Sequence, residues 1–404
     1  MDRRTLLQAA GGLAAPGLSL APAFSLAPVF AARAYATPAS DQKVLVVFLR
    51  GAYDAANIVI PTGSDFYYQA RPTLQIARPD PSDPNASLPL DADWSLHPAL
   101  KDSIYPLWQA KEVAFIPFAG TDDMSRSHFE TQARIERGES AASPGLSSGF
   151  MGRLAREASG AKPISFTDVL PTSFRGAGDV PNIGVAALSA AGVDPRQKAM
   201  IENMYRSGTL SGVVRQGFDI REQAMQAVSG PTDPTAPKPA GFALAMSRVA
   251  RLMRLGYSLG FIDVGGWDTH VNQGAATGTL AQRATELGKG LARFAQDMKP
   301  DLWRNTTVVV ISEFGRTFRQ NGDNGTDHGH GSVYWVLGGS VRGGRMVGEQ
   351  VQVAERTLNQ NRDLPVLNDY RSILGGVFRQ AYGLSAKSLD TVFPGAPQTS
   401  LTLI

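Results

Sequence analysis

The 404-residue chain contains no cysteine, which excludes disulfides, thiolate metal ligands and a cysteine nucleophile. Its formal charge is only +3, and residues 1–36 contribute two of these charges, so nothing suggests a nucleic-acid-binding surface. Beyond residue 36 there is no run of the roughly eighteen apolar residues that a membrane-spanning helix needs. Hydrophobic residues still make up 43% of the chain. We therefore expect a globular protein with a large core, no transmembrane segment and no nucleic-acid partner.

The first 36 residues have the pattern of an export signal. Arg3 and Arg4 precede a weakly hydrophobic Ala/Leu/Gly/Pro run that ends in the small-x-small sequence Ala34-Tyr35-Ala36. This arrangement resembles a twin-arginine signal peptide. We expect residues 1–36 to engage the twin-arginine export machinery and to be removed, which makes the mature protein periplasmic or secreted. An uncleaved anchor is the alternative.

The rest of the chain alternates short β-branched runs with segments of helical periodicity. This repetition predicts an α/β fold in which a mostly parallel sheet lies at the centre. The expected strands are 43–49, 113–118, 259–264, 306–311 and 333–337, and the expected helices are 97–110, 152–158, 194–228, 242–255 and 279–298. We expect one domain over 37–404, with Pro-rich surface loops near 77–97 and 230–241.

Carboxylates and imidazoles gather between the last two expected strands. The segment after 306–311 contains Glu313, Asp323, Asp327, His328 and His330, interspersed with glycines. These side chains supply the oxygen and nitrogen ligands that divalent metals prefer. The pattern predicts a metal site, and the alternative is a histidine-bearing surface turn.

Two other expected strand ends carry groups of the same kind. Asp54 follows 43–49, and Asp268 and His270 follow 259–264. Alternate residues of an extended backbone point to the same side, so Asp268 and His270 could bind one ion. The carboxyl ends of parallel strands meet at one edge of a sheet. Three strand ends together therefore indicate a shared metal site, although Asp54 could also be a turn residue that bonds its own backbone.

The segment after 113–118 carries Ser125, Arg126, Ser127 and His128 where a helix is expected to begin. A helix N-terminus presents unpaired N–H groups and favours anions. A serine held there near a metal could act as a nucleophile. Alternatively, Ser125 only caps the helix and His128 packs in its first turn.

Together these motifs resemble the DUF1501 family of exported bacterial proteins, which belongs to the alkaline phosphatase and sulfatase superfamily. The resemblance is carried by the leader, LVVFLRGAYDAANIVIP, SRSHFETQ, GGWDTH, VVVISEFGRT and GTDHGHG. It implies a three-layer α/β/α sandwich with one or two divalent ions at the carboxyl edge of the sheet. The metal ligands that it implies are Asp54, Asp268, His270, Glu313, His328 and His330.

The sequence departs from the superfamily pattern at two positions. Phe314 follows Glu313 where a histidine is usual, and Met124 occupies the slot in which many members carry the nucleophile. Ser125 and Ser127 are the substitutes for that nucleophile. The absence of cysteine also excludes the cysteine-derived formylglycine of most sulfatases.

The function that the resemblance implies is an exported, metal-dependent hydrolase of phosphate or sulfate esters, whose substrate is an anionic small molecule or a glycan ester. The attacking group would be Ser127, Ser125 or a water on the metal. Arg126 and Arg316 would hold the anionic oxygens, because a guanidinium can bind two at once. The candidate catalytic residues are thus Ser125, Arg126, Ser127, His128 and Arg316. The alternative, favoured by Met124 and by the missing histidine after Glu313, is a non-catalytic periplasmic binding or assembly protein with the same fold.

Overall fold

The computed structural model describes residues 41–185, 194–229, 240–397 and 401–404, all of which belong to one compact unit. The expected signal peptide at 1–36 lies outside the described residues, as does nearly all of the Pro-rich segment 230–241. Within the described ranges, no helix combines the length and the apolarity that crossing a membrane requires.

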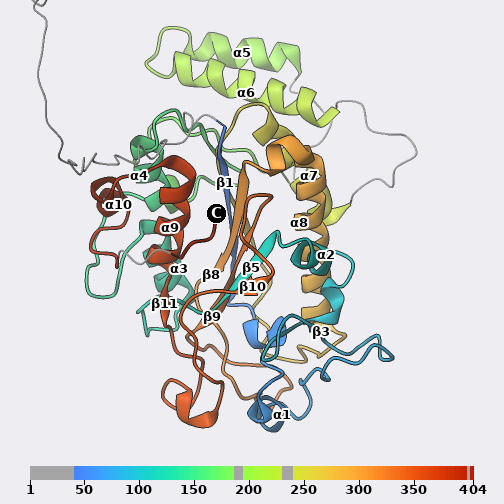
Figure 1. The fold of residues 1–404 in the computed structure, drawn as a ribbon. Helices are drawn as coiled ribbons and strands as arrows, with labels where there is room; N and C mark the ends of the chain where they lie inside the picture. Colours follow the sequence, from blue (N-terminus) through green and yellow to red (C-terminus); the bar gives the residue numbers. More distant parts are fainter. Residues whose placement is uncertain (1–40, 186–193, 230–239, 398–400) are drawn as a thin grey trace, which may run out of the picture. The chain divides into compact units, whose positions relative to one another are not determined.

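A mostly parallel sheet lies at the centre of this unit (Figure 1), with the strand order β10-β5-β9-β8-β1-β7-β6 and with β11 also paired to β5. The strands are β1 Lys43–Leu49, β5 Val113–Gly120, β6 Pro163–Ser165, β7 Leu259–Val264, β8 Thr306–Ser312, β9 Ser332–Leu337, β10 Arg345–Met346 and β11 Asn368–Asp369. β1 pairs in parallel with both β7 and β8. Of the described strands in this sheet, β9 alone runs antiparallel to its neighbours, β5 and β8. The predicted α/β fold with a mostly parallel sheet is confirmed.

Helices cover both faces of this sheet and complete three layers (Figure 1). β1 shows the reason, because all seven of its residues are buried and its alternate side chains enter two separate cores. A strand that is buried on both faces needs such an unbroken apolar run. The core that contains Leu45 and Val47 is covered by α2 (Ile104–Gln109), α7 (Gly241–Arg254) and α8 (Thr279–Trp303). The core that contains Val46 and Phe48 is covered by α3 (His128–Arg137), α4 (Phe150–Glu157), α9 (Tyr370–Tyr382) and α10 (Ala386–Val392).

The remaining elements are short or lie apart from the central sheet. The strands β2 Val59–Ile60, β4 Ser95–Leu96 and β3 Leu88–Pro89 form a small antiparallel sheet within and beside the Pro-rich segment 77–97. The other α-helices are α1 Asp65–Ala70, α5 Pro195–Tyr205 and α6 Ser211–Ser229. The 3-10 helices are η1 Ala55–Asn57, η2 Pro98–Leu100, η3 Thr172–Phe174 and η4 Glu355–Thr357.

Three expected helices are divided or extended, whereas 152–158 and 242–255 differ from α4 and α7 by at most two residues at either end. Residues 97–110 form η2 and α2 instead of one helix. Pro106 has no N–H, which a helix continuing from upstream would need for a backbone hydrogen bond. Proline is tolerated in the first turn of a helix, so α2 can begin at Ile104. Residues 194–228 form two helices, α5 and α6. Residues 279–298 belong to α8, which continues to Trp303 through a kink at Lys299, whose φ is +61° just before Pro300.

His97 is a buried histidine that the fold keeps neutral. It precedes η2, where its Nδ1 accepts a hydrogen bond from the amide of Ala99 at 3.0 Å. Its Nε2 donates to the carbonyl of Ala275 at 3.0 Å. Burial lowers its pKa from 6.5 to about 4. Protonation would direct a second N–H at the amide of Ala99, so both burial and hydrogen bonding oppose the charged ring.

We expect this histidine to make the protein sensitive to acid. Because the unfolded chain binds the proton more readily, stability is lost as the pH falls from 6.5 towards 4. Between about pH 7 and about pH 4 the free energy of unfolding should fall by about 3 kcal/mol more in the wild type than in His97→Asn. The asparagine keeps an acceptor for Ala99 but does not titrate. Urea unfolding of both proteins at the two pH values measures this difference. Equal losses in the two proteins would contradict the prediction.

Candidate metal centre

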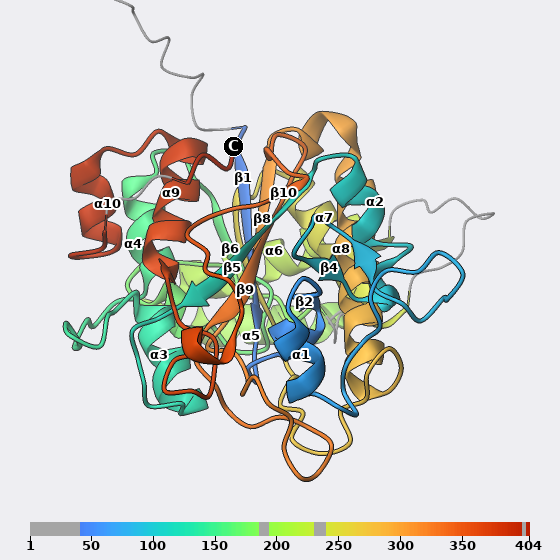
Figure 2. The same cartoon turned by 60° about the horizontal axis from the view of Figure 1, so that its bottom comes forward.

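The candidate site lies at the carboxyl edge of the sheet, in the loops that follow β5, β7 and β8. Figure 2 turns this edge, which is at the bottom of Figure 1, towards the viewer. β9 runs antiparallel to β8, so the residues that precede β9 reach the same edge. His128 begins α3 after β5, Asp268 and His270 follow β7, Glu313 follows β8, and His328 precedes β9. Four separate segments of the chain therefore bring polar side chains to this edge.

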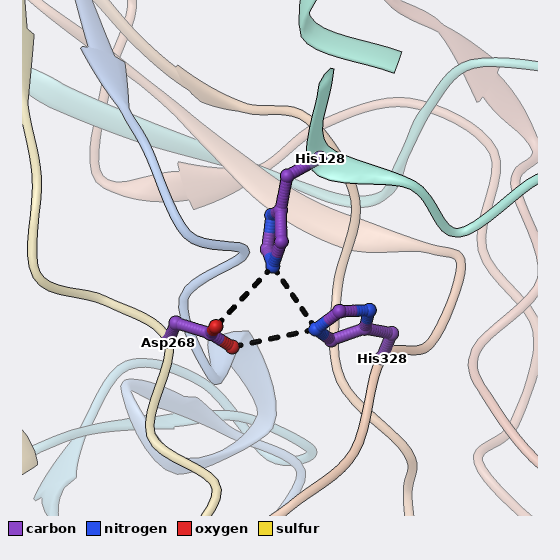
Figure 3. Close-up of side chains that lie close together, drawn as sticks. All are labelled: His128, Asp268 and His328. Carbon is purple, nitrogen blue, oxygen red and sulfur yellow. Dashed lines mark hydrogen bonds and ion pairs between the residues drawn. The ribbon is translucent and has the colours of Figure 1, made fainter. Parts of the chain in front are cut away.

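Two imidazoles and one carboxylate form the centre of the site (Figure 3). His128, Asp268 and His328 each contribute one ligand atom, and these atoms lie within 4.8 Å of one another. The Nε2 atoms of His128 and His328 are 3.0 Å apart. The Asp268 oxygens lie 3.5 Å from Nε2 of His128 and 3.4 Å from Nε2 of His328. We refer to His128, Asp268 and His328 as the ligand group.

Both imidazoles of the ligand group are held from behind. Nδ1 of His128 donates to Oε1 of Glu313 at 2.7 Å, and Nδ1 of His328 donates to the carbonyl oxygen of Arg126 at 2.9 Å. When both rings are neutral, each has only one N–H, so both Nε2 atoms then present their lone pairs to the centre. A carboxylate or carbonyl behind each histidine is the usual support of a metal-ligating imidazole.

Glu313 acts in this site as the support of His128. The sequence suggested that Glu313 binds the metal, but its Oε1 accepts hydrogen bonds from His128, from Nε2 of Gln132 and from the amide of Gly51, while its Oε2 accepts one from Ser312. Burial alone would raise the pKa of Glu313, but these hydrogen bonds, that from His128 foremost, lower it. The same bond is the main cause of the raised pKa of His128.

His270 lies at the rim of the ligand group. Its Nε2 is 2.8 Å from Oδ1 of Asp268 and 3.0 Å from Nε2 of His328, and its Nδ1 is 3.3 Å from Oδ1 of Asp327. Nε2 of His328 thus faces two other ring nitrogens at 3.0 Å, although it has a single lone pair. A divalent ion held by His128, Asp268 and His328 would bind this lone pair. Tetrahedral ligands at about 2.0–2.1 Å from zinc lie about 3.3 Å apart, close to the observed separations.

Arg316 is placed to hold Asp268 and not a substrate. Its side chain is fully buried, and its Nη2 donates to Oδ1 of Asp268 at 2.5 Å. Its Nε donates to the carbonyl of Ala52 at 2.7 Å. Burial alone would raise the pKa of Asp268, but Arg316 above all lowers it and keeps the carboxylate ionised. The expected role of Arg316 in holding anionic oxygens does not fit this buried position.

Arg126 is likewise committed to a carboxylate. Its guanidinium donates to the buried Asp363, from Nε at 3.1 Å and from Nη2 at 3.0 Å. Its backbone has a positive φ of 54°, and its carbonyl supports His328 as described above. Arg126 therefore shapes the site through its backbone, while its guanidinium does not point freely at the centre.

The two candidate serines have different environments. Ser125 donates its hydroxyl to Oδ2 of Asp123 at 3.1 Å. Ser127, and not Ser125, occupies the N-cap position of α3, and its side chain makes no capping hydrogen bond. Within the described ranges, no hydrogen bond joins either hydroxyl to the ligand group. The structure thus leaves Ser127 the freer of the two, and it gives His128 a place in the ligand group.

Asp54 and His330, two other expected ligands, do not join the ligand group. Asp54 is fully buried, and its two oxygens accept hydrogen bonds from Arg71 at 2.5 and 3.0 Å and from Gln273 at 2.6 Å. A guanidinium therefore already neutralises this carboxylate. His330 is buried elsewhere, and burial lowers its pKa to about 4.

The sequence analysis did not single out two residues beside the site, and it assigned His128 a different role from the one that the geometry suggests. Arg71 stands in a loop without a motif, and nothing in the sequence links it to Asp54. Arg362 is exposed, and its Nη2 donates to the carbonyl of His328 at 3.0 Å. The signal for His128 was present, since a fourth strand end carried an imidazole, but that residue was interpreted as catalytic and not as a ligand.

Comparison with known proteins gives one family match and several distant structures. A family model described as "Protein of unknown function (DUF1501)" matches residues 114–393, which include the whole ligand group. No curated protein matches the chain. Ps i-CgsB is 10% identical, with 88% of this chain and 75% of that chain covered and a TM-score of 0.38. A putative sulfatase from Bacteroides thetaiotaomicron VPI-5482 is 10% identical, with 89% of this chain and 76% of that chain covered and a TM-score of 0.34. A TAB5 alkaline phosphatase variant with bound Mg is 12% identical, with 74% of this chain and 90% of that chain covered and a TM-score of 0.32.

Proposed function

The chain belongs to the DUF1501 family, and we propose that it is an exported, metal-dependent hydrolase of phosphate or sulfate esters. The observation that carries the proposal is the convergence of two imidazole nitrogens and one ionised carboxylate in the ligand group. Export is supported by the sequence of residues 1–36 alone, and an anionic small molecule or a glycan ester is the proposed substrate.

The donor set of the ligand group fits a divalent metal. Two imidazole nitrogens and a carboxylate are the three protein ligands found in many catalytic zinc sites, which keep a further position open. Asp268 is 44% exposed at its side chain, so solvent and substrate can approach. An ion bound there would polarise the ester and stabilise the charge that develops on the transferring group.

The protein's own side chains would orient this chemistry. Glu313 fixes the ring of His128 from behind, and Phe314 stacks on that ring with 5.0 Å between the centroids. Arg316 fixes Asp268 from the buried side. Ser127 is the favoured nucleophile, because it directly precedes His128 and, in the described part of the chain, its hydroxyl forms no hydrogen bond. A water at the open position is the other candidate for attack.

Arg362 takes the role that the sequence assigned to Arg126 and Arg316. It is exposed, and it lies beside His328. Burial alone would raise the pKa of Asp327, but hydrogen bonds to that carboxylate lower it, and the positive charge of Arg362 adds to this lowering. A guanidinium at the rim can donate two hydrogen bonds to the oxygens of a phosphate or a sulfate. Arg319 offers a matched control, since it is also a surface arginine but pairs with Glu355 and Asn361.

The proposal is tested by assaying the mature protein with Zn²⁺, Mn²⁺ or Mg²⁺ against aryl phosphate and aryl sulfate esters. We expect hydrolysis that a chelator abolishes. Arg362→Ala should raise KM about tenfold or more while metal content stays unchanged, because a hydrogen bond to a charged group is worth about 1.5–3 kcal/mol. Arg319→Ala should leave KM unchanged. A protein that takes up no divalent ion, or one that hydrolyses esters equally well after metal removal, would overturn the proposal.

A second function is favoured by the surroundings of the serines. The Ser125 hydroxyl is bound to Asp123, and neither serine is bound to the ligand group. A metal-containing binding or assembly protein without turnover would show the same arrangement. Stoichiometric metal uptake without hydrolysis of either ester class would favour this second function.

A further inference from the structure

A buried amide joins two of the three segments that carry the ligand group, the loop of Asp268 and the loop of His328. Gln273 is fully buried, and its Oε1 accepts hydrogen bonds from Oγ1 of Thr269 at 2.8 Å and from Oγ1 of Thr326 at 3.0 Å. Thr269 directly follows Asp268 in the loop after β7. Thr326 stands two residues before His328 in the loop before β9. One carbonyl oxygen thus fixes the spacing between a carboxylate ligand and an imidazole ligand.

Asp54 determines which way this amide points. Nε2 of Gln273 donates to Oδ2 of Asp54 at 2.6 Å. An ionised carboxylate can only accept hydrogen bonds, so the amide must turn its NH₂ group to Asp54 and its oxygen to the two threonines. A flipped amide would place its oxygen against the carboxylate and its NH₂ group against both hydroxyls. Asp54 therefore selects the orientation in which Gln273 accepts from both loops.

Arg71 holds Asp54 in turn. Both residues are fully buried, and the guanidinium binds both carboxylate oxygens. Its Nε also donates to the carbonyl of Phe318 at 2.8 Å, and its Nη2 to that of Thr317 at 3.1 Å. These carbonyls lie in the loop between β8 and β9, which carries His328 at its other end. Buried polar networks whose members are all partnered are rigid and specify one geometry.

We propose that Asp54 and Gln273 are positioning residues, which set the geometry of the metal site by tying the Asp268 loop to the His328 loop without contacting the metal. The inference rests on the proposed metal-binding function of the ligand group. It gives Asp54 a different role from the direct ligation that the family resemblance implied. It also explains why a carboxylate at the end of β1 is paired with a buried guanidinium.

The test compares Co²⁺ binding by three forms of the full mature protein: wild type, Gln273→Leu and Gln273→Met. Both substitutions remove the acceptor for Thr269 and Thr326 and the donor to Asp54, and neither adds a charge. The readouts are the Co²⁺ dissociation constant and the visible absorption spectrum of the bound ion, with Tm measured alongside.

We expect Gln273→Leu and Gln273→Met to bind Co²⁺ about tenfold more weakly, with a changed spectrum. Direct outer-shell partners of metal ligands have effects of about 10- to 100-fold, and Gln273 acts one step further from the ion, through Thr269 and Thr326. Gln282→Leu, at an exposed position on α8, is the matched control and should change neither readout. If Gln273→Leu does not fold, Gln273→Met carries the same comparison, since methionine is unbranched and similar in length to glutamine.

The outcomes separate the two levels of the proposal. Unchanged affinity and spectrum in both single variants, with only a lowered Tm, would overturn the positioning role and leave the metal site intact. No Co²⁺ uptake by the wild type would refute the proposed function and the inference with it.

Discussion

His128→Ala, Asp268→Ala and His328→Ala are each expected to lower the affinity for a divalent ion by at least about 100-fold. The reason is that each variant removes one of three ligands, whereas the loss of a mere supporting residue typically costs 10- to 100-fold. Their positions within 4.8 Å of one another make the three effects parts of one site. Elemental analysis after dialysis, together with a competition titration, measures the loss, and circular dichroism verifies that each variant is folded.

His330→Asn is the matched control for His328→Ala. The two histidines are separated by one residue, but only His328 directs its Nε2 towards His128 and Asp268. His330 is buried outside the ligand group, so its replacement should leave the metal content stoichiometric. A protein that kept its metal without His328 and lost it without His330 would move the site and contradict the assignment.

Arg71→Ala is expected to destabilise the protein by about 3–5 kcal/mol, because it leaves the charge of Asp54 buried without its partner. The Arg71–Asp54 pair has an N–O distance of 2.5 Å, and both side chains are at most 1% exposed. Urea unfolding near neutral pH measures the change in the free energy of unfolding.

The surface pair Arg78–Asp65 provides the control for this prediction. It has the same residue types and the same N–O distance of 2.5 Å, but its side chains are 53% and 85% exposed. Arg78→Ala should therefore cost less than about 1 kcal/mol. Similar effects of the two substitutions would mean that Asp54 is not a buried charge, and the positioning role of Asp54 would then lose its basis.

The strands of this protein could be predicted because burial on both faces leaves a clear pattern. Lys43–Leu49 and Thr306–Ser312 are buried along their whole length and appear as unbroken runs. Helix bounds were less predictable where proline intervened, as at Pro106, because the periodicity of apolar residues continues across a break in the backbone. The gathering of polar groups at one edge followed from the parallel strands.

The roles of those polar groups depended on partners that are remote in sequence. Glu313 and Asp54 are both carboxylates just beyond a strand, and the sequence suggested metal ligation for both. Glu313 instead accepts from His128, which stands 185 residues away, and Asp54 accepts from Arg71. The sequence contained no sign of either pairing, since neither involves a fixed spacing or a motif.

The sequence by itself determined the α/β class, the positions of the main strands, the candidate polar residues and the family. The tertiary structure decided that His128 joins Asp268 and His328, that Glu313 and Arg316 support them, and that Asp54 is neutralised by Arg71. The physical reason is that hydrophobic runs act locally and mark strands wherever they occur, whereas a buried carboxylate has few acceptor positions and they are filled by whichever donors packing brings within reach.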